Sequence, residues 1–548
     1  MGKLRIKYDK YLKKYFGYDS LKVLQFKIIY YIIQKKKDIC GILATGFGKS
    51  ICYQLPFLLT KKNVIVISPL ISLMEDQMDT LKKLNIDVCC LNSNNKNKSG
   101  DKYDILKGNN KIIYITPEYL LNCQDFIKKL SSNDNLCCFA IDESHCISSW
   151  SDNSFRPEYR NLNCLREWAP DVPILTLTAT ANDKVVTDII QFLNLRNPKI
   201  IKSSFDRPNL YLGVSNKSKD IYNDLNQLLK KYKNEFIIIY TRTRDYTEKI
   251  AKVVRDCGLK CLPYHAGLNT DLRNKTQQQF MDGKVKCIVA TIAFGMGINN
   301  RHVRLVIQYG CSGDLTSYYQ EIGRAGRDGE ESECHLFHST NDFRLNRFFM
   351  SKIEDINFRR YKEEQIVKME KYVFTHACRR KFILAHFGED YENNKCNKCD
   401  NCTNVHSYDT RDLTNETKLI IELINSLFNN FGCNILVQIL RGSKAKKIIS
   451  FKKLKLYNKG KKYSDKWWKE FIRILITNDI LVEKTLEGRF GSVLHIGDTG
   501  KQWYKKIKDK EISDENKLVL PITELLTKLD PSFNKSYDAV LEEFGFLS

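Results

Sequence analysis

The sequence predicts an α/β protein with two lobes, each built on a parallel sheet, followed by a helical module and a small helix-and-hairpin unit. Over residues 40–200, short apolar runs rich in β-formers alternate with amphipathic segments, and this pattern repeats once after residue 235. After about residue 345 the apolar runs stop and a cysteine cluster follows. Nearly continuous apolar strands separated by helices are typical of parallel sheets covered on both faces.

The composition limits the classes of protein to which the chain can belong. Hydrophobic residues make up 43% of the 548 residues, which excludes a mainly disordered protein. No apolar run is long enough for a membrane span, and the charged N-terminus lacks the apolar core of a secretory signal. The formal net charge of +24 favours a polyanionic partner, most often nucleic acid, although a Lys-rich proteome would give a similar excess.

The first lobe is predicted over residues 1–205. Its expected strands are VIVISPL (64–70), KIIYITPE (111–118), CCFAIDESH (137–145) and PILTLTAT (173–180). Each run ends in polar residues, and ligands bind at the carboxyl ends of the strands in open parallel sheets. We therefore expect the chemically active residues of this lobe to follow its strands.

The remaining chain is divided into four further parts. A second lobe at 206–345 contains EFIIIYTRTR (235–244), KCIVATIAFGMG (286–297) and VRLVIQYG (303–310). A helical module follows at 346–410. Two predicted helices (417–430 and 464–478) and a hairpin around EGRFG (487–491) indicate a winged-helix domain at 411–505, and the polar residues 506–548 are expected to form a tail.

A phosphate-binding loop is predicted just after the first strand of the first lobe, in the sequence ATGFGKS (44–50). Glycines allow backbone N–H groups to surround phosphates, and the following helix N-terminus adds positive potential. Lys49 would reach the β- and γ-phosphates and Ser50 would ligate Mg²⁺. The residues expected to bind nucleotide here are Thr45, Gly46, Phe47, Gly48, Lys49 and Ser50.

An acidic pair ends the strand at 137–145. Asp142 could hold Mg²⁺, and Glu143 could polarise the water that attacks the γ-phosphate. Acidic pairs at strand ends are also common as solvated caps. In combination with the phosphate loop, the pair indicates an ATP-hydrolysing site with Lys49, Asp142 and Glu143 as catalytic residues.

The chain resembles a superfamily 2 helicase of the RecQ type, with two RecA-like lobes. The phosphate loop, DESH (142–145), TAT (178–180) and QEIGRAGRDG (320–329) match helicase motifs I, II, III and VI in order. Four further segments resemble RecQ proteins: FGY (16–18) with Gln25, the segment from Trp150 through FRPEY (155–159), SFDRPN (204–209) and AFGMG (293–297). The resemblance covers residues 12–500.

This resemblance implies roles for residues that the local pattern leaves unassigned. Tyr18 would stack on adenine and Gln25 would bond its edge. Lys22 stands where the family usually has Arg; because Lys cannot stack as a plane, we expect a weaker grip on the nucleotide there. Arg324 and Arg327 are placed to face the γ-phosphate, and an Arg finger there speeds phosphoryl transfer, with Arg327 the favoured candidate.

The resemblance also implies a route from ATP to nucleic acid. His145, Thr178 and Thr180 would couple hydrolysis to lobe movement. An aromatic-rich loop would bind or sense the strand through Trp150, Phe155, Arg156 and Tyr159, since aromatic rings stack on any base. Core packing is the competing interpretation of the Trp and Phe rings. The loop is one residue longer than usual, and Asn299 stands where the family has an acidic residue.

Four cysteines are predicted to form a structural zinc site. The polar segment KCNKCDNC places Cys396, Cys399 and Cys402 three residues apart, and Cys378 supplies a fourth ligand. An iron–sulfur cluster is the alternative. The spacing resembles the RecQ zinc module. The other cysteines among the chain's 19 read as free thiols in a reducing compartment.

A basic segment lies within the predicted winged helix. Residues 441–469 carry twelve Lys and Arg side chains, a density that would neutralise phosphates and make binding salt-dependent. LRGS (440–443) resembles the RecQ winged helix, and Phe490 in the hairpin could act as a wedge at a duplex end.

The predicted function is an ATP-dependent helicase that uses ATP and Mg²⁺, carries Zn²⁺, and moves 3′ to 5′ to separate DNA strands in repair, recombination or replication. Single-stranded and forked DNA are the expected partners, and no membrane is expected. The alternatives are an RNA helicase, and a nucleic-acid-binding or annealing protein with a poorly coupled ATPase. We expect an intracellular, reducing location: the nucleus of a eukaryotic cell, or the cytoplasm for a bacterial or cytoplasmic viral protein.

Overall fold

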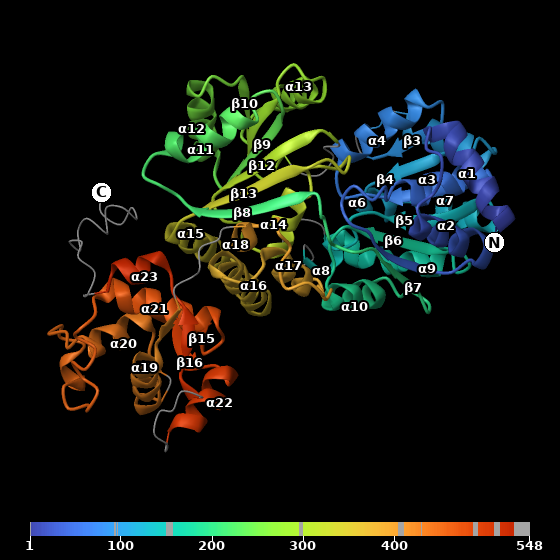
Figure 1. The fold of residues 1–548 in the computed structure, drawn as a ribbon. Coiled ribbons are helices and arrows are strands. Elements are labelled where there is room, and N and C mark those ends of the chain that lie inside the picture. The colour runs from blue at the N-terminus through green and yellow to red at the C-terminus, as the bar shows by residue number, and fades with distance from the viewer. Residues whose placement is uncertain are drawn as a thin grey trace.

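The computed structural model describes residues 2–92, 95, 97–149, 157–294, 300–403, 410–428, 430–485, 492–508 and 516–530. Two α/β lobes lie side by side, a helical module lies against the second, and a smaller unit follows at the far end (Figure 1). This arrangement confirms the predicted fold class. Within the described residues, no helix is long and apolar enough to cross a membrane.

Lobe 1 is built on a seven-stranded parallel sheet in the order β3-β4-β2-β5-β6-β1-β7. Its strands are β1 (Ile39–Ile42), β2 (Asn63–Ile67), β3 (Val88–Leu91), β4 (Ile112–Ile115), β5 (Leu136–Ile141), β6 (Ile174–Thr178) and β7 (Lys199–Lys202). Successive side chains point to opposite faces, and both faces are buried: Val64 and Val66 join one apolar cluster, and Ile65 and Ile67 join the other. This double burial explains the nearly continuous apolar runs.

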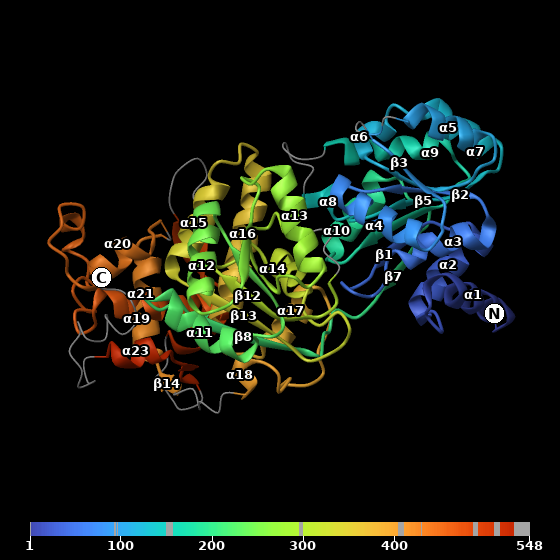
Figure 2. The same ribbon diagram turned by 90° about the horizontal axis from the view of Figure 1, so that it is seen from above.

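Helices cover both faces of this sheet (Figure 2). They are α1 (Gly2–Phe16), α2 (Val23–Lys35), α3 (Ile51–Thr60), α4 (Ile71–Lys83), α5 (Lys98–Leu106), α6 (Pro117–Leu120), α7 (Gln124–Ser132), α8 (Cys146–Ser149), η1 (Pro157–Asn163), α9 (Cys164–Trp168) and α10 (Asp183–Phe192). β1 lies between β6 and the edge strand β7, so the loop that follows it lies beside the end of β6 and close to β5.

Lobe 2 repeats the plan with a six-stranded parallel sheet in the order β10-β11-β9-β12-β13-β8. The strands are β8 (Leu210–Asn216), β9 (Phe236–Thr241), β10 (Cys261–Tyr264), β11 (Cys287–Ala290), β12 (Val303–Tyr309) and β13 (Ser332–His338). The helices are α11 (Ile221–Lys231), α12 (Arg244–Asp256), α13 (Thr270–Met281), α14 (Leu315–Ile322) and α15 (Thr340–Met350). The turn that follows α14 carries the predicted arginine pair.

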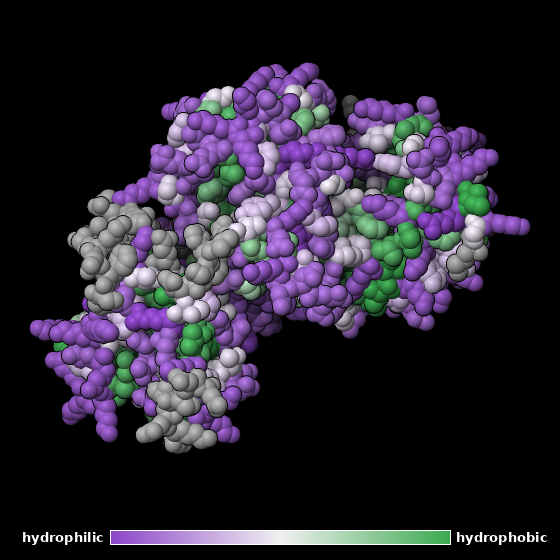
Figure 3. All heavy atoms as spheres, viewed as in Figure 1, coloured by the Kyte–Doolittle hydropathy of each residue, from purple (hydrophilic) through white to green (hydrophobic). Residues whose placement is uncertain are grey.

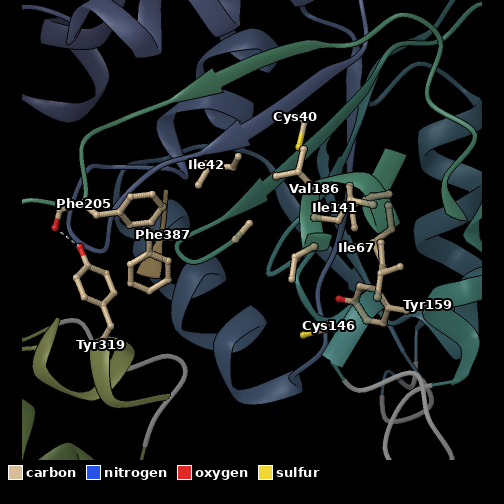
Figure 4. Packing of buried hydrophobic residues seen from close by; sticks show 14 of the residues in the cluster. Cys40, Ile42, Ile67, Ile141, Cys146, Tyr159, Val186, Phe205, Tyr319 and Phe387 are labelled. Atoms are coloured by element: carbon tan, nitrogen blue, oxygen red, sulfur yellow. Dashed lines mark hydrogen bonds between the residues drawn. The ribbon is translucent and has the colours of Figure 1, made fainter. Parts of the chain in front are cut away.

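The helical module comprises α16 (Ile356–Phe374), α17 (Arg379–His386) and α18 (Asp400–Thr403). It also fixes the segment that joins the lobes. Phe387 stacks on Phe205 with ring centroids 4.4 Å apart, and the Tyr319 hydroxyl donates to the Phe205 carbonyl at 2.7 Å (Figure 4). One apolar cluster therefore runs from lobe 1 through α14 into this module.

The last unit has the helices and hairpin of a winged helix. Its helices are α19 (Thr414–Ser426), α20 (Cys433–Leu440), η2 (Ile449–Phe451), α21 (Asp465–Thr477) and α22 (Asp498–Ile507), and its hairpin pairs β15 (Leu481–Thr485) with β16 (Ser492–Ile496). The hairpin tip, including Phe490, lies outside the described residues. Trp467 and Trp468 fill the core of this unit.

The predicted tail at 506–548 is not wholly a tail. Within it, β17 (Val519–Pro521) pairs antiparallel with β14 (Thr410–Asp412), and α23 (Glu524–Lys528) follows. Leu526 is fully buried in the same core as Trp467. This stretch is mostly polar, but a few of its apolar side chains complete the core of the last unit.

Candidate nucleotide and nucleic-acid sites

The phosphate loop leaves β1 and leads into α3 as predicted, with two glycines in the left-handed region. Gly46 has φ +80° and Gly48 has φ +90°, so a side chain at either position would be strained. The Gln25 amide donates to the carbonyls of Phe47 and Gly48, each at 3.1 Å. A Cβ at Gly48 would lie 2.7 Å from that amide nitrogen. Gln25 therefore holds the loop in shape.

The acidic pair lies beside this loop, directly after β5. Burial, and next the charge of Glu143, raise the pKa of Asp142 to about 7, while the Lys49 ammonium opposes the shift. Lys49 and Asp142 thus act on each other across the site, although they are 93 positions apart in the chain. Ser50 stands one residue before α3, and its hydroxyl with the Asp142 carboxylate offers the oxygen ligands that Mg²⁺ prefers.

A chain of polar contacts leads from the acidic pair to the second lobe. His145 Nδ1 lies 2.9 Å from the Thr178 hydroxyl and 3.4 Å from the Glu143 carboxylate. Burial lowers the pKa of His145, and the Glu143 carboxylate opposes this shift. The Gln320 amide of lobe 2 donates to Thr180 Oγ1 at 3.0 Å and lies 3.4 Å from His145 Nε2. Sequence reasoning did not assign a role to Gln320, although it belongs to the motif VI segment.

The two predicted arginines lie in the turn that follows α14, which ends at Ile322, and they occupy different surroundings. Arg327 packs on the phosphate loop: a Cβ at Gly46 would lie 3.5 Å from Arg327 Cγ. Burial, followed by the charge of Arg324, lowers the pKa of Arg327, and the Glu143 carboxylate opposes the shift. Arg324 is 8% exposed, and its charge also acts on Tyr240 and Glu321 of its own lobe. A phosphate between the lobes would therefore meet Arg327 first.

The predicted base site is lined by Tyr18 and Lys22. Tyr18 is 41% exposed, which leaves its ring accessible for stacking. Lys22 Nζ lies 4.5 Å from the centroid of the Phe47 ring, and its backbone amide donates to Gln25 Oε1 at 2.9 Å. That oxygen has a second lone pair, which can accept from the amino group of a base.

The structure corrects one expectation for the aromatic-rich loop. Tyr159 is fully buried in the core of lobe 1, so it does not present its ring to a base. Its hydroxyl instead donates to the backbone carbonyl of Asp142 at 3.3 Å, which ties the end of the loop to the acidic pair. Trp150, Phe155 and Arg156 lie outside the described residues, as does Asn299.

The four predicted zinc ligands converge in the helical module. The sulfurs of Cys378, Cys396, Cys399 and Cys402 all lie within 4.8 Å of one another, and those of Cys396 and Cys402 are 3.9 Å apart. Four thiolates around Zn²⁺ at about 2.3 Å would be separated by about 3.8 Å. The cluster therefore fits a tetrahedral zinc ion with no open position. His376 and His386 are not members of it.

The basic segment of the winged helix is exposed. Between residues 441 and 463 the side chains that face solvent include Lys444, Lys446, Lys447, Lys452, Lys453, Lys455, Lys459, Lys461 and Lys462. Figure 3 shows hydrophilic side chains over this end of the unit, at the lower left. Such a surface can bind a phosphate backbone without reading bases.

Four family models match consecutive parts of the chain. They are the DEAD/DEAH box helicase over residues 23–189, the helicase conserved C-terminal domain over 220–329, the RecQ zinc-binding domain over 340–403 and the RQC domain over 407–517. Their order along the chain is the order of the structural units described above.

Similar proteins come from viruses, bacteria and animals. R290 of Acanthamoeba polyphaga mimivirus, named as an ATP-dependent RNA helicase, is 44% identical over 91% of this chain and 92% of its own length. The ATP-dependent DNA helicase RecQ of Bacillus subtilis is 36% identical over 86% of this chain and 79% of its own. The mouse bifunctional exonuclease/helicase WRN is 38% identical over 90% of this chain, which spans 36% of that protein.

Solved structures support the fold of the two lobes. The helicase MrfA bound to DNA has a TM-score of 0.52 at 19% identity, covering 67% of this chain and 56% of that one. The DEAD-box helicase Mss116 bound to single-stranded RNA has a TM-score of 0.50 at 16% identity, covering 69% and 89%.

Proposed function

This chain belongs to the RecQ family of ATP-dependent DNA helicases, and we propose that it couples ATP hydrolysis to 3′–5′ movement along one DNA strand and to strand separation. The observation that carries this proposal is the meeting of two lobes at one site. Lobe 1 contributes the phosphate loop and the acidic pair, and lobe 2 contributes Arg327 against Gly46. A site completed only when lobes meet can convert hydrolysis into relative motion.

Each residue of the site has a separate role in ATP hydrolysis. Lys49 would bind the β- and γ-phosphates of ATP, while Ser50 and Asp142 would hold Mg²⁺, which neutralises charge on the phosphates. Glu143 would orient and polarise the attacking water. Arg327 would stabilise charge that develops on the transferred phosphoryl group. The contacts His145–Thr178 and Gln320–Thr180 would pass the change to the rest of both lobes.

We propose that the nucleic acid is DNA, with Zn²⁺ bound to the four cysteines. The zinc module and winged helix support DNA, because the RecQ zinc-binding and RQC models match there. The mimivirus relative named as an RNA helicase makes RNA the second candidate. The free thiols of the chain also support a reducing intracellular compartment.

Nucleic-acid stimulation of the ATPase distinguishes the two candidates. We expect single-stranded DNA to raise kcat about tenfold or more, and RNA of the same length and sequence to raise it much less, because lobe closure then depends on differential strand binding. The measurement is steady-state ATP hydrolysis with DNA, RNA or neither, followed by unwinding of duplexes with a 3′ or a 5′ tail. Stronger stimulation by RNA would overturn the DNA assignment, and unwinding only from a 5′ tail would overturn the direction.

Lys49→Ala is expected to lower kcat for ATP hydrolysis about 10²- to 10³-fold, because one preorganised charge on the phosphates is lost. Binding of single-stranded DNA should stay within about twofold of wild type. Lys36→Ala is the matched control, since Lys36 is an exposed lysine just after α2, away from the loop. Equal hydrolysis by Lys49→Ala and wild type would exclude this loop as the ATP site.

A further inference from the structure

A lobe 2 arginine lies at the predicted base site of lobe 1. Arg301 donates a hydrogen bond to the Tyr18 hydroxyl at 2.5 Å, and its guanidinium carbon lies 5.8 Å from the centroid of the Tyr18 ring. The two residues are 283 positions apart in the sequence. A purine stacked on Tyr18 would therefore lie within reach of this guanidinium.

Polar contacts of its neighbours hold the backbone that carries Arg301. Asn300 is buried, and its side-chain oxygen accepts from the His302 amide at 2.9 Å. His302 Nδ1 then lies 3.1 Å from the Asp328 carboxylate, and Arg304 also pairs with Asp328. Because Asp328 follows Arg327 directly, these contacts connect the turn of Arg301 to the residue that meets the phosphate loop.

Lys22 cannot supply the planar contact at this site. Its ammonium already lies over the face of Phe47, and an ammonium has neither the plane nor the fork of a guanidinium. The charges of Arg207 and Arg301 both act on Lys22 and, after burial, lower its pKa. Three cationic side chains from both lobes thus converge where an anionic nucleotide would bind.

We propose that Arg301 contacts the adenine base held on Tyr18 and replaces, from the opposite lobe, the planar contact that Lys22 does not make. This inference rests on the proposed ATP site and deepens it. The base is then contacted by side chains of both lobes, in addition to the phosphate contact that Arg327 makes from lobe 2. Affinity for ATP then depends on the purine and not only on the phosphates.

Equilibrium binding tests the inference without requiring turnover. ATP and UTP compete with a ribose-labelled fluorescent ATP analogue on the full chain. We expect Arg301→Ala to weaken ATP binding about tenfold, within the range of a desolvated cation–π contact, and UTP binding by about twofold, because a smaller ring stacks less. Arg301→Lys should recover only part of the loss. Arg344→Ala, which removes an exposed arginine of α15, should bind both nucleotides as wild type does.

A second experiment tests whether a guanidinium at position 22 restores ATP binding. Introducing Lys22→Arg into Arg301→Ala should restore ATP binding to within about threefold of wild type, because the guanidinium returns on the other side of the base. Unchanged ATP binding in Arg301→Ala, or equal weakening of ATP and UTP, would overturn the inference, since the latter marks a phosphate contact. Failed rescue by Lys22→Arg would overturn the claim of replacement. A wild type that binds ATP but does not hydrolyse it with DNA would instead overturn the proposed function.

Discussion

Arg327→Ala is expected to lower kcat for DNA-stimulated ATP hydrolysis by about 10³-fold or more, with a much smaller change in KM. An arginine that meets the γ-phosphate stabilises charge in the transition state of phosphoryl transfer and contributes little to the ground state. The structure places Arg327 against Gly46 of the phosphate loop, from the opposite lobe. The measurement is steady-state hydrolysis at saturating single-stranded DNA over a range of ATP concentrations.

Arg324→Ala is the matched comparison, three residues away in the same turn after α14. Because the Arg324 charge acts on Tyr240 and Glu321 within lobe 2, we expect its loss to cost less catalysis than that of Arg327. Arg327→Lys should remain strongly impaired, since an ammonium lacks the guanidinium fork. A larger loss in Arg324→Ala than in Arg327→Ala would reverse the assignment of the finger.

Removal of zinc is expected to unfold the helical module. Four converging thiolates repel one another without a cation, and structural zinc sites contribute on the order of 10 kcal/mol to folding. Cys399 is fully buried, and the Leu212 amide of β8 donates to the adjacent Lys398 carbonyl at 3.1 Å. We therefore expect Cys399→Ser to lose about one zinc per chain, and to destabilise the edge of lobe 2 as well as the module.

Metal analysis and thermal unfolding measure this outcome together. Cys257→Ser is the control, because Cys257 is a partly exposed thiol at the end of α12, outside the cluster. It should retain zinc and unfold as wild type does. Intact wild-type protein that contains no zinc and unfolds cooperatively would contradict the assignment, and iron in its place would favour the alternative cluster.

The sequence predicted the central strands of both sheets and was less informative at the edges. Strands β2, β5, β9 and β12 are buried on both faces, so their apolar runs are unmistakable. Edge strand β7 exposes three of its four residues and has no such pattern. The winged-helix unit extends beyond its predicted end at residue 505. The few apolar side chains that complete its core are spread among polar ones, so no apolar run marks them in the sequence.

For the candidate site, the sequence motifs predicted which residues belong to the site, but not the contacts that each side chain makes. The phosphate loop, the acidic pair and the arginine pair could be read from local motifs. The core position of Tyr159 could not, because stacking on a base and packing in a core call for the same aromatic ring. The contact of Arg301 with Tyr18 joins distant segments and depends on how the lobes pack, which no local pattern encodes.

The pairing of β14 with β17 has a practical consequence for dissection of the molecule. The first and last described residues of the winged-helix unit lie at one edge, since Thr410 pairs with Pro521 and Arg411 forms an ion pair with Asp530. A fragment ended at residue 517, where the RQC match stops, would remove β17 and α23 and uncover the side of the core that Leu526 covers. An autonomously folding piece for DNA-binding studies should therefore be excised as residues 410–530.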